Sequence, residues 1–439
     1  MKTLKLKKKY ETYPEYKDSG VEWFGNIPKG WKVGPVRSVL KERVEKNTKL
    51  VSDNILSVMK DVGVIRYADK GDIGNKSSDR PEHYKIVHAG DIVVNSMNLV
   101  IGSVGQSREL GVTSSVYIIY YPKNQETSSD YYHYLFRDKS WQKTLGRRLG
   151  KGIMELRESI KPYDLRLELV PIPSLSEQNK IVGYLDEKTS LIDQTISKKQ
   201  KLIELLREKR TAVINRAVTK GLDLDVEMVE SGVEWIGKIP KGWKMRKLFH
   251  LFETIGSGTT PDEKYLTDKD EGIPWVNTGD LTDYYMEIPS KRVVPEAIRE
   301  ISTLKVFSKN SVVIAMYGAT IGKLGIPKFN FCTNQACCVL ENPVSEVSEK
   351  FIYFWLLGNK KYIIELGVGG GQPNINKDIV KSLKISLPTL GDQLKIVDYL
   401  ELKIDNYNKS IKQVEKSIEL LQEFKSSLIS NVVTGKIKI

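Results

Sequence analysis

The chain contains one stretch of sequence twice. Residues 19–32 read Ser-Gly-Val-Glu-Trp-Phe-Gly-Asn-Ile-Pro-Lys-Gly-Trp-Lys, and residues 231–244 repeat them with changes only at Phe24/Ile236 and Asn26/Lys238. Because two tryptophans and an Ile-Pro-Lys-Gly segment recur at matching places, the chain holds two copies of one structural unit. A period of roughly 210 residues is far too long for a solenoid and corresponds to a whole domain plus a connector.

A second repeated block fixes the other end of each unit. Residues 173–185 match residues 388–400, and the match continues without a gap to Thr219 and Thr434. The segments between the blocks differ far more, and residues 53–97 have almost no counterpart in the second half. Shared ends and divergent middles indicate two readers of different ligands on a common frame. We predict a globular segment at 1–172, a helix at 173–221, a second globular segment at 222–387 and a C-terminal helix at 388–439.

Both connectors have the heptad pattern of long amphipathic helices, which we expect at about residues 176–219 and 391–434. The expected apolar seam consists of Leu185, Ile192, Ile196, Ile203, Leu206 and Val213 in the first helix and of Leu400, Ile404, Tyr407, Ile411, Val414, Ile418, Leu421 and Leu428 in the second. Each seam also carries a basic residue at the same step, Arg210 and Lys425. A helix with one apolar stripe needs a partner, so we expect the two helices to pair as an antiparallel coiled coil. The alternative, an ordinary helical hairpin inside one core, does not explain why each helix follows its own domain-sized segment.

Composition narrows the class of protein. With 439 residues, 40% of them hydrophobic, the chain has material for two cores, and no apolar run is long enough to span a bilayer. The basic residues 1–10 lack the apolar core of a secretory signal, and Cys332, Cys337 and Cys338 lack metal-ligand spacing, so we expect buried free thiols in a cytoplasmic protein. The net charge of +13 favours a polyanionic partner, of which nucleic acid is the commonest, although many basic proteins bind none.

The globular segments have the pattern of an α+β fold. Apolar runs at residues 91–94 and 115–120 are typical of strands, and residues 311–315 and 336–340 correspond to them in the second half. Between the strands of each pair lies a glycine-rich segment, at 96–105 and 316–325. Such a segment allows close approach to a ligand, and it equally suits a tight turn that needs glycine for its backbone angles.

These segments together identify a family. They comprise Ser-Gly-Val-Glu-Trp-x-Gly-x-Ile-Pro-x-Gly-Trp at both domain starts, Gly258-Thr-Thr-Pro261, Ile273-Pro-Trp-Val-Asn-Thr-Gly-Asp280, Gly318-Ala-Thr-Ile-Gly-Lys323, Gly369-Gly-Gly-Gln-Pro-Asn-Ile375 and Pro-x-Leu-x-Glu/Asp-Gln-x-x-Ile-Val at both helix starts. Over nearly the whole chain, this set resembles the specificity subunit of type I restriction-modification systems. The first half departs from the pattern, because it has no clear match to Gly258-Thr-Thr-Pro261 or to Pro274-Trp275.

The resemblance implies a non-catalytic subunit with two target recognition domains, each reading one half of a bipartite double-stranded DNA sequence. It also implies that the two helices hold these domains apart and dock two methyltransferase subunits, in a complex that includes restriction subunits. S-adenosylmethionine, ATP and magnesium are then expected on those partners, with no cofactor and no metal in this chain.

The sequence also lacks the catalytic motifs that methyl transfer would require, in agreement with a non-catalytic subunit. The sequence has no Asp/Asn-Pro-Pro-aromatic motif for amino methylation, and Gly369-Gly-Gly371 does not lie between a strand and a helix as a cofactor-binding motif would. Two alternatives stay open. One alternative to the non-catalytic DNA-reading subunit is an enzyme with an unrecognised methylase or nuclease centre of its own, and the other is a coiled-coil adaptor that assembles protein partners without binding DNA.

Candidate DNA-contacting residues are those whose side chains suit phosphates or base edges. In the first domain they are Asn95, Ser96, Asn98, Arg147, Arg148 and Lys151, and in the second they are Thr259, Thr260, Asn277, Thr278, Tyr317, Thr320, Gln372 and Asn374.

Overall fold

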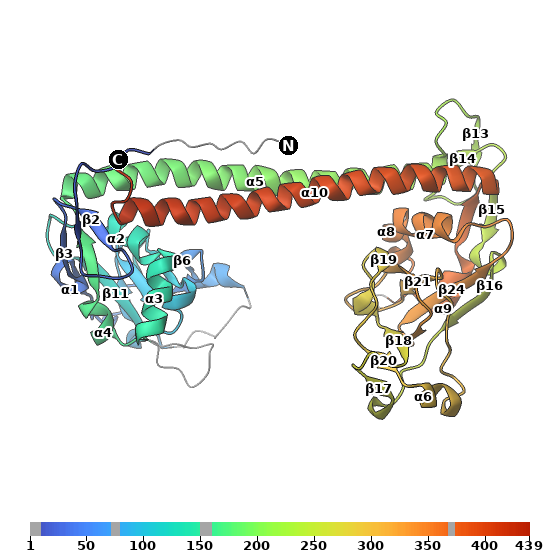
Figure 1. Ribbon diagram of the computed structural model, residues 1–439, viewed down its shortest axis with the longest axis horizontal. Coiled ribbons are helices and arrows are strands. Elements are labelled where there is room, and N and C mark those ends of the chain that lie inside the picture. The colour runs from blue at the N-terminus through green and yellow to red at the C-terminus, as the bar shows by residue number, and fades with distance from the viewer. Residues whose placement is uncertain (1–9, 72–79, 150–159, 368–373) are drawn as a thin grey trace. The chain divides into compact units, whose positions relative to one another are not determined.

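The computed structural model describes residues 10–71, 80–149, 160–367 and 374–439 (Figure 1). The chain forms two compact units, one of Met1–Lys199 with Lys416–Ile439 and the other of Gln200–Glu415. Each unit therefore contains one globular α+β domain, the first part of one long helix and the last part of the other. Among the described residues, no helix is long and apolar enough to cross a membrane.

The first unit is built on a four-stranded sheet of order β4-β11-β8-β9, in which β11 is antiparallel to both of its neighbours. Its strands are β1 (Tyr16–Asp18), β2 (Asn26–Pro28), β3 (Lys32–Pro35), β4 (Leu40–Glu42), β5 (Leu56–Met59), β6 (Gly63–Arg66), β7 (Lys85–Val87), β8 (Ile92–Asn95), β9 (Val104–Gln106), β10 (Gly111–Thr113), β11 (Tyr117–Pro122) and β12 (Leu169–Ile172). Its short helices are α1 (Val36–Val39), α2 (Ser129–Phe136), α3 (Lys139–Leu149) and α4 (Pro162–Leu167). β3 pairs with β12, so the two ends of the domain meet.

The second unit repeats this plan and enlarges it. Its strands are β13 (Met228–Glu230), β14 (Lys238–Pro240), β15 (Lys244–Lys247), β16 (Phe252–Ser257), β17 (Leu266–Thr267), β18 (Ile273–Val276), β19 (Tyr284–Met286), β20 (Arg292–Val293), β21 (Val312–Ala315), β22 (Leu324–Pro327), β23 (Cys332–Thr333), β24 (Cys337–Pro343) and β25 (Lys384–Leu387). Its short helices are α6 (Pro295–Glu300), α7 (Glu349–Gly358), α8 (Lys360–Glu365) and α9 (Lys377–Ser382). Its two larger sheets have the orders β16-β24-β21-β22-β19 and β17-β20-β18-β23.

The paired core strands confirm the correspondence between the halves. β8 pairs with β11 in the first unit, and β21 pairs with β24 in the second, where the sequence predicts matched strands. At the base of each domain, β15 pairs with β25 as β3 does with β12. These shared strand pairs, together with the long helices, form a common frame in the two units, and the segments between the frame strands differ.

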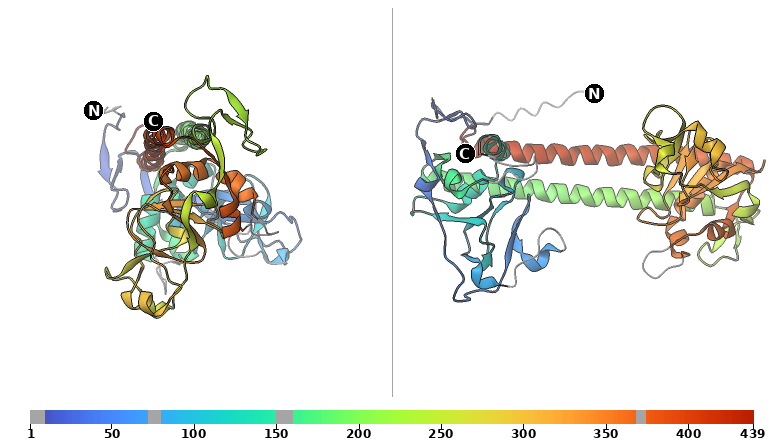
Figure 2. Two further views of the ribbon diagram at one scale, coloured as in Figure 1. Left: turned by 90° about the vertical axis from the view of Figure 1, so that its right-hand side faces the viewer. Right: turned by 90° about the horizontal axis from the view of Figure 1, so that it is seen from below.

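The long helices are α5 (Leu175–Lys220) and α10 (Leu390–Val433), which agree with the predicted bounds to within about two residues. Every predicted seam residue is buried or half-buried, and Leu185 and Leu400 are fully buried. Within each unit the two helices run antiparallel (Figure 2). In the second unit Arg210 Nη1 donates to Asn408 Oδ1 at 2.6 Å, and in the first unit Lys425 Nζ donates to Asp193 Oδ2 at 2.6 Å.

The start of each long helix is fastened to its domain by a buried glutamine. The side chain of Gln178 accepts a hydrogen bond from the Ser128 backbone N–H at 2.8 Å and donates to the carbonyls of Glu126 and Pro173. Gln393 makes the same set of bonds in the second unit, to Ser348 N–H, Glu346 O and Pro388 O. Because the amide oxygen and both amide hydrogens find partners, each glutamine is buried without loss of hydrogen bonds.

The end of each long helix enters the core of the domain that it does not follow. The Tyr131 hydroxyl donates to the carbonyl of Val433 at 2.7 Å in the first unit, and the Ser386 hydroxyl donates to that of Val218 at 3.2 Å in the second. Both helices stop before a glycine with positive φ, Gly221 or Gly435. A Cβ on Gly435 would lie 2.4 Å from Pro28 Cδ, so the first repeated stretch packs closely on the end of α10.

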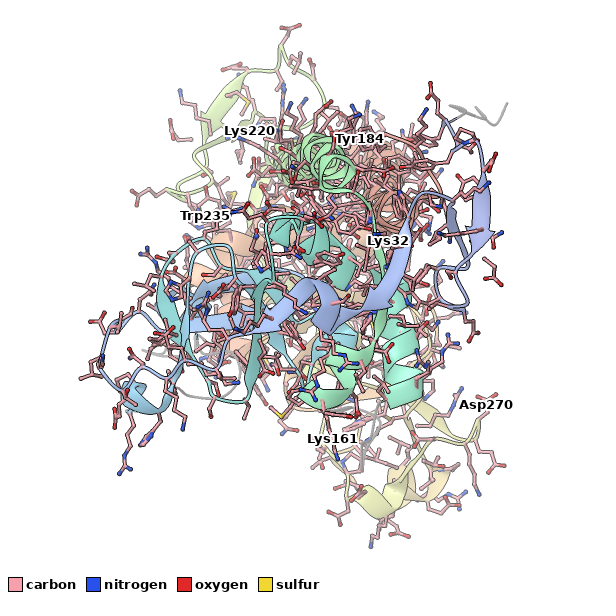
Figure 3. The ribbon with its side chains drawn as sticks, turned by 90° about the vertical axis from the view of Figure 1, so that its left-hand side faces the viewer. Lys32, Lys161, Tyr184, Lys220, Trp235 and Asp270 are labelled. Carbon is pink, nitrogen blue, oxygen red and sulfur yellow. The ribbon has the colours of Figure 1, made fainter. Side chains whose placement is uncertain are left out.

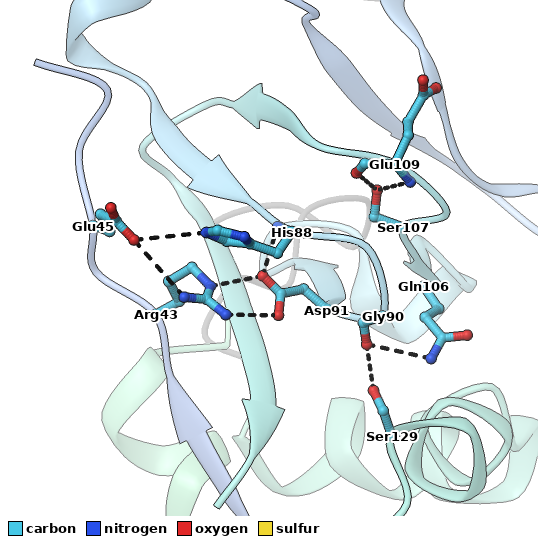
Figure 4. Close-up of polar contacts among 9 residues, drawn as sticks. All are labelled: Arg43, Glu45, His88, Gly90, Asp91, Gln106, Ser107, Glu109 and Ser129. Carbon is cyan, nitrogen blue, oxygen red and sulfur yellow. Dashed lines mark hydrogen bonds and ion pairs between the residues drawn. The ribbon is translucent and has the colours of Figure 1, made fainter. Parts of the chain in front are cut away.

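One further polar link lies at the end of α5, and another joins two sheet strands of the first unit. Lys220, in the last turn of α5, donates to the carbonyl of Ile236 at 3.0 Å, and Figure 3 marks Lys220 together with Trp235, the residue before Ile236. In the first unit Arg43, which follows β4, holds the buried Asp91 with bonds of 2.7 and 3.1 Å at the start of β8 (Figure 4). The Asp91 carboxylate raises the pKa of Arg43 through these hydrogen bonds.

Candidate nucleic-acid interface

A buried threonine organises the candidate edge of the second unit. The hydroxyl of Thr333, at the end of β23, donates to the carbonyl of Val276 at 2.7 Å, and β23 runs parallel to β18 at this point. On the other side Gly258 approaches so closely that a Cβ there would lie 1.7 Å from the Thr333 carbonyl oxygen. Only glycine fits at position 258, and the ends of β16, β18 and β23 are held together as one platform.

The predicted residues Thr259, Thr260 and Asn277 lie at this platform. Thr260 Oγ1 donates to Gln335 Oε1 at 2.6 Å, and Asn334 Nδ2 donates to Asn277 Oδ1 at 3.1 Å. The Thr259 hydroxyl donates to the carbonyl of Thr303, and Thr278 begins the short helical turn that Asn277 caps. The structure thus joins segments from either side of residues 261–276 into one group of hydroxyl and amide side chains.

Two further predicted residues of the second unit, Tyr317 and Asn374, adjoin backbone that is bonded next to the platform, and Thr320 lies in the turn after Tyr317. Met316 N–H donates to the carbonyl of Ala336 at 2.8 Å, and Ala336 follows Gln335 of the platform. The half-buried Tyr317 is the residue after Met316. Ile375 N–H in turn donates to the carbonyl of Met316. The exposed Asn374 is the residue before Ile375. Thr320 is half-buried in the turn between β21 and β22, whereas Gln372 lies outside the described residues.

In the first unit the equivalent edge contains Asn95, Ser96 and Asn98. Asn95 and Ser96 are buried: the Asn95 side chain accepts from Met97 N–H at 3.2 Å, and the Ser96 hydroxyl donates to the carbonyl of Val116. The Asn98 side chain is half-buried. Asn95 and Ser96 thus help to shape the turn, and of these residues Asn98 presents the most accessible amide.

The basic candidates of the first unit differ in their surroundings. Arg147, near the end of α3, is exposed to solvent. Arg148 holds both carboxylate oxygens of the buried Glu168, at 3.0 and 3.3 Å, and so fastens α3 to the residue before β12. Lys151 lies outside the described residues. Arg147 is therefore the better placed of the two described arginines for a phosphate.

The glycine-rich turns are shaped by packing in both units. Gly102 and Gly322 have φ of 100° and 72°, which favours glycine. A Cβ on Gly102 would lie 2.8 Å from Asp61 Oδ1, and Lys139 bonds to that same carboxylate. These contacts and the positive φ explain why position 102 requires glycine.

The platform recurs in the first unit with different exposed side chains. The buried Thr113 donates to the carbonyl of Leu56 at 3.0 Å, as Thr333 does to that of Val276. Tyr117 N–H then bonds the carbonyl of Ser114, as Cys337 N–H bonds that of Asn334. Ser114 and Ser115 therefore occupy the places of Asn334 and Gln335.

Sequence reasoning missed these two dipeptides. The signal lies in the alignment of Gly111-Val-Thr-Ser-Ser-Val-Tyr117 with Phe331-Cys-Thr-Asn-Gln-Ala-Cys337. Only the threonine is identical in the two segments, and the residue before it is Val112 in one and Cys332 in the other. Burial raises the pKa of Cys332 and Cys337 to about 11, so both are neutral thiols under the platform.

Comparison with known proteins assigns the chain to a family. The family model described as "Type I restriction modification DNA specificity domain" matches twice, at residues 28–207 and 240–420. The chain belongs to this family. It is a type I restriction-modification specificity subunit, and each match covers most of one domain and the larger part of the helix that follows it.

Relatives share this organisation over most of their length. The chain is 24% identical over 437 residues to the putative type I restriction enzyme MjaX specificity subunit of Methanocaldococcus jannaschii, covering 94% of this chain and 95% of that one. It is 25% identical over 296 residues to the EcoR124I/EcoR124II specificity subunit of Escherichia coli, covering 64% and 66%.

Solved structures support the fold of the specificity subunit. One, titled as the structural basis of complex assembly and conformational transition of the type I R-M system, aligns with a TM-score of 0.73 at 15% identity, over 93% of this chain and 98% of that chain. The HsdS subunit from Thermoanaerobacter tengcongensis aligns with a TM-score of 0.53 at 15% identity, over 94% and 98%.

Proposed function

We propose that this specificity subunit reads a bipartite double-stranded DNA target, with one half-site for each unit, and leaves methyl transfer and cleavage to partner subunits. The observation that carries the proposal is the repetition of one frame around different contents. Gln178 and Gln393 make the same bonds, and Thr113 and Thr333 hold the same platform, while the residues displayed beyond them differ. A common frame with two different reading surfaces suits a target with two different halves.

The charge of the chain supports a polyanionic ligand. The net charge of +13 allows sequence-independent contacts with phosphates, and the amide and hydroxyl side chains at the platforms suit base edges. Affinity for DNA should therefore fall steeply with salt concentration, while the choice of sequence should depend on the platform residues.

The outward faces of the long helices are the proposed docking surface for methyltransferase subunits. Leu205 and Leu420 occupy matching positions of the repeat and are 50% and 53% exposed, although seam residues lie on either side of both along their helices. The other exposed apolar residues on these helices include Leu191, Leu202, Leu402 and Phe424. A matched exposed pair, Leu205 and Leu420, suits two copies of one partner, and restriction subunits would join that complex.

The cofactors of the reactions would then lie on the partners. We assign S-adenosylmethionine to the methyltransferase subunits and ATP with magnesium to the restriction subunits. Among the residues that the structure describes, no group of three or more His, Cys, Asp or Glu side chains could hold a metal ion.

Reconstitution with methyltransferase subunits tests the proposal. We expect methylation at two short half-sites separated by an unread spacer, detected by sequencing of methylated DNA, and no methylation by this chain alone. Methylation or cleavage by the purified chain alone would favour an enzyme with its own centre. A complex that assembles but binds DNA without sequence preference would favour a protein adaptor.

A further inference from the structure

The dipeptide after the buried threonine is accessible to solvent in each platform. In the second unit Thr333 is fully buried, Asn334 is half-buried and Gln335 is exposed. In the first unit Thr113 is fully buried, Ser114 is half-buried and Ser115 is exposed. The same backbone support thus presents an amide pair in one unit and a hydroxyl pair in the other.

Rigid support distinguishes this turn from an ordinary surface loop. Asn334 Oδ1 accepts from Ala336 N–H at 3.1 Å, and its Nδ2 donates to Asn277. Residues on both sides of the turn lie in strands β23 and β24, and Cys337 and Cys338 are fully buried beneath it. A side chain at position 335 therefore projects from a fixed backbone, which reduces the entropy that it loses when it binds.

The hydrogen-bond capacity of Gln335 matches one base. Its Oε1 accepts from the Thr260 hydroxyl at 2.6 Å, which orients the amide and leaves one lone pair of the oxygen available. Both hydrogens on its Nε2 are also available for a ligand, because the hydrogen bond to Thr260 uses only the oxygen. An amide of this orientation donates to adenine N7 and accepts from adenine N6 in the major groove.

We propose that Gln335 reads an adenine in the half-site of the second unit, with Thr260 as its positioning residue, and that Ser114 and Ser115 form the corresponding reading turn of the first unit. This inference rests on the proposed function, and it names the residues that choose the base. Asn334 acts through Asn277 to hold the turn and makes no base contact of its own.

The test uses the full chain assembled with methyltransferase subunits and a pool of duplexes randomised in the second half-site. We expect the wild-type complex to select adenine at one position, and Gln335→Ala to lower that preference by about 5- to 150-fold with the other positions unchanged. Thr260→Val should weaken the same preference, and Thr260→Ser, which keeps the hydroxyl, should restore it. The matched control is Gln125→Ala, because Gln125 is an exposed glutamine in a turn between β11 and α2 of the first unit.

The outcomes separate this inference from the function on which it depends. If the wild-type complex selects no bipartite sequence, the proposed function itself fails. If wild type selects a sequence and Gln335→Ala keeps every base preference, or lowers all of them equally, Gln335 is not a base reader. Gln335→Glu covers the case in which the alanine variant does not fold: an acceptor-only carboxylate should replace the adenine preference by a preference for cytosine, and an unchanged adenine preference would overturn the assignment.

Discussion

Lys425 of α10 donates to both carboxylate oxygens of Asp193 in α5, at 2.7 and 2.6 Å. At the matching positions of the repeat, Arg210 of α5 donates to Asn408 of α10. Each seam thus contains one basic residue that bonds across to the other helix, and both pairs have the same antiparallel register. Polar pairs inside an apolar seam favour one register, because a shifted alignment leaves the basic residue without its acceptor.

The ion pair predicts a charge-reversal effect. Asp193→Lys should lower the stability of the first unit, because Lys425 would then face a like charge, and adding Lys425→Asp should recover part of the loss. The side chain of Asp193 is 58% exposed, so solvent screening limits the coupling energy to about 0.2–1 kcal/mol. Thermal unfolding of the single and double variants measures it, and a coupling that does not shrink in high salt would contradict an electrostatic origin.

The seam itself predicts a larger effect. Replacing Ile203 and Ile418 with Asp should cost several kcal/mol, because Ile203 is buried and Ile418 half-buried in the helix pair. The matched control is Leu205→Asp with Leu420→Asp, since these exposed residues lie on the same helices. The control should retain its unfolding temperature and lose methyltransferase binding, and equal destabilisation of the two double variants would contradict the assignment of seam and outer face.

The glutamines at the helix starts predict a third effect. Gln178→Ala or Gln393→Ala should destabilise its own unit by about 2–4 kcal/mol, because the Ser128 or Ser348 N–H and the neighbouring carbonyls lose their partner in a buried place. Gln413→Ala on the exposed face of α10 is the control. Hydrogen exchange at the Ser128 and Ser348 amides localises the change, and unaltered protection would show that the glutamines do not fasten the helices.

The cysteines predict a dependence on pH. Burial raises the pKa of Cys332 and Cys337 to about 11 and that of Cys338 to about 12, from an ordinary value of 9.0. Between these values the unfolded chain loses thiol protons that the folded chain keeps, so the stability of the second unit should fall as the pH rises above about 9. Serine at all three positions should reduce this slope, and a disulfide reagent at pH 8 should label the native thiols only as fast as the unit opens.

The positions of the long helices could be predicted from the sequence, because the repeated blocks mark where each helix begins and ends. The matched blocks located α5 and α10 to within about two residues, and the heptads identified their buried faces. The sequence did not show that the last turns at Val218 and Val433 enter the core of the domain that each helix does not follow, because that contact depends on tertiary packing. The reading turn was missed for the same reason.

The role of Thr333 illustrates this limit. It follows from the carbonyl of Val276 and the close approach of Gly258, which are far from it in the chain. Arg148 is a similar case, because its charge suited a phosphate whereas the fold gives it the buried partner Glu168. Residue types predict what a side chain can bind, and only the fold decides whether a protein group is already bound there.

The frame also sets where the two readers can be separated. Because β3 pairs with β12 at the base of the first domain, exchanging residues 36–168 for the equivalent segment of a related specificity subunit keeps both base strands and both long helices. We expect such a chimera to change one half-site of the methylated sequence and to preserve the other. The incoming segment must supply a hydroxyl in place of Tyr131, which bonds the end of α10, so a Tyr131→Phe variant measures the cost of that contact separately. A chimera that assembles with methyltransferase subunits but changes both half-sites would mean that the two units do not read independently.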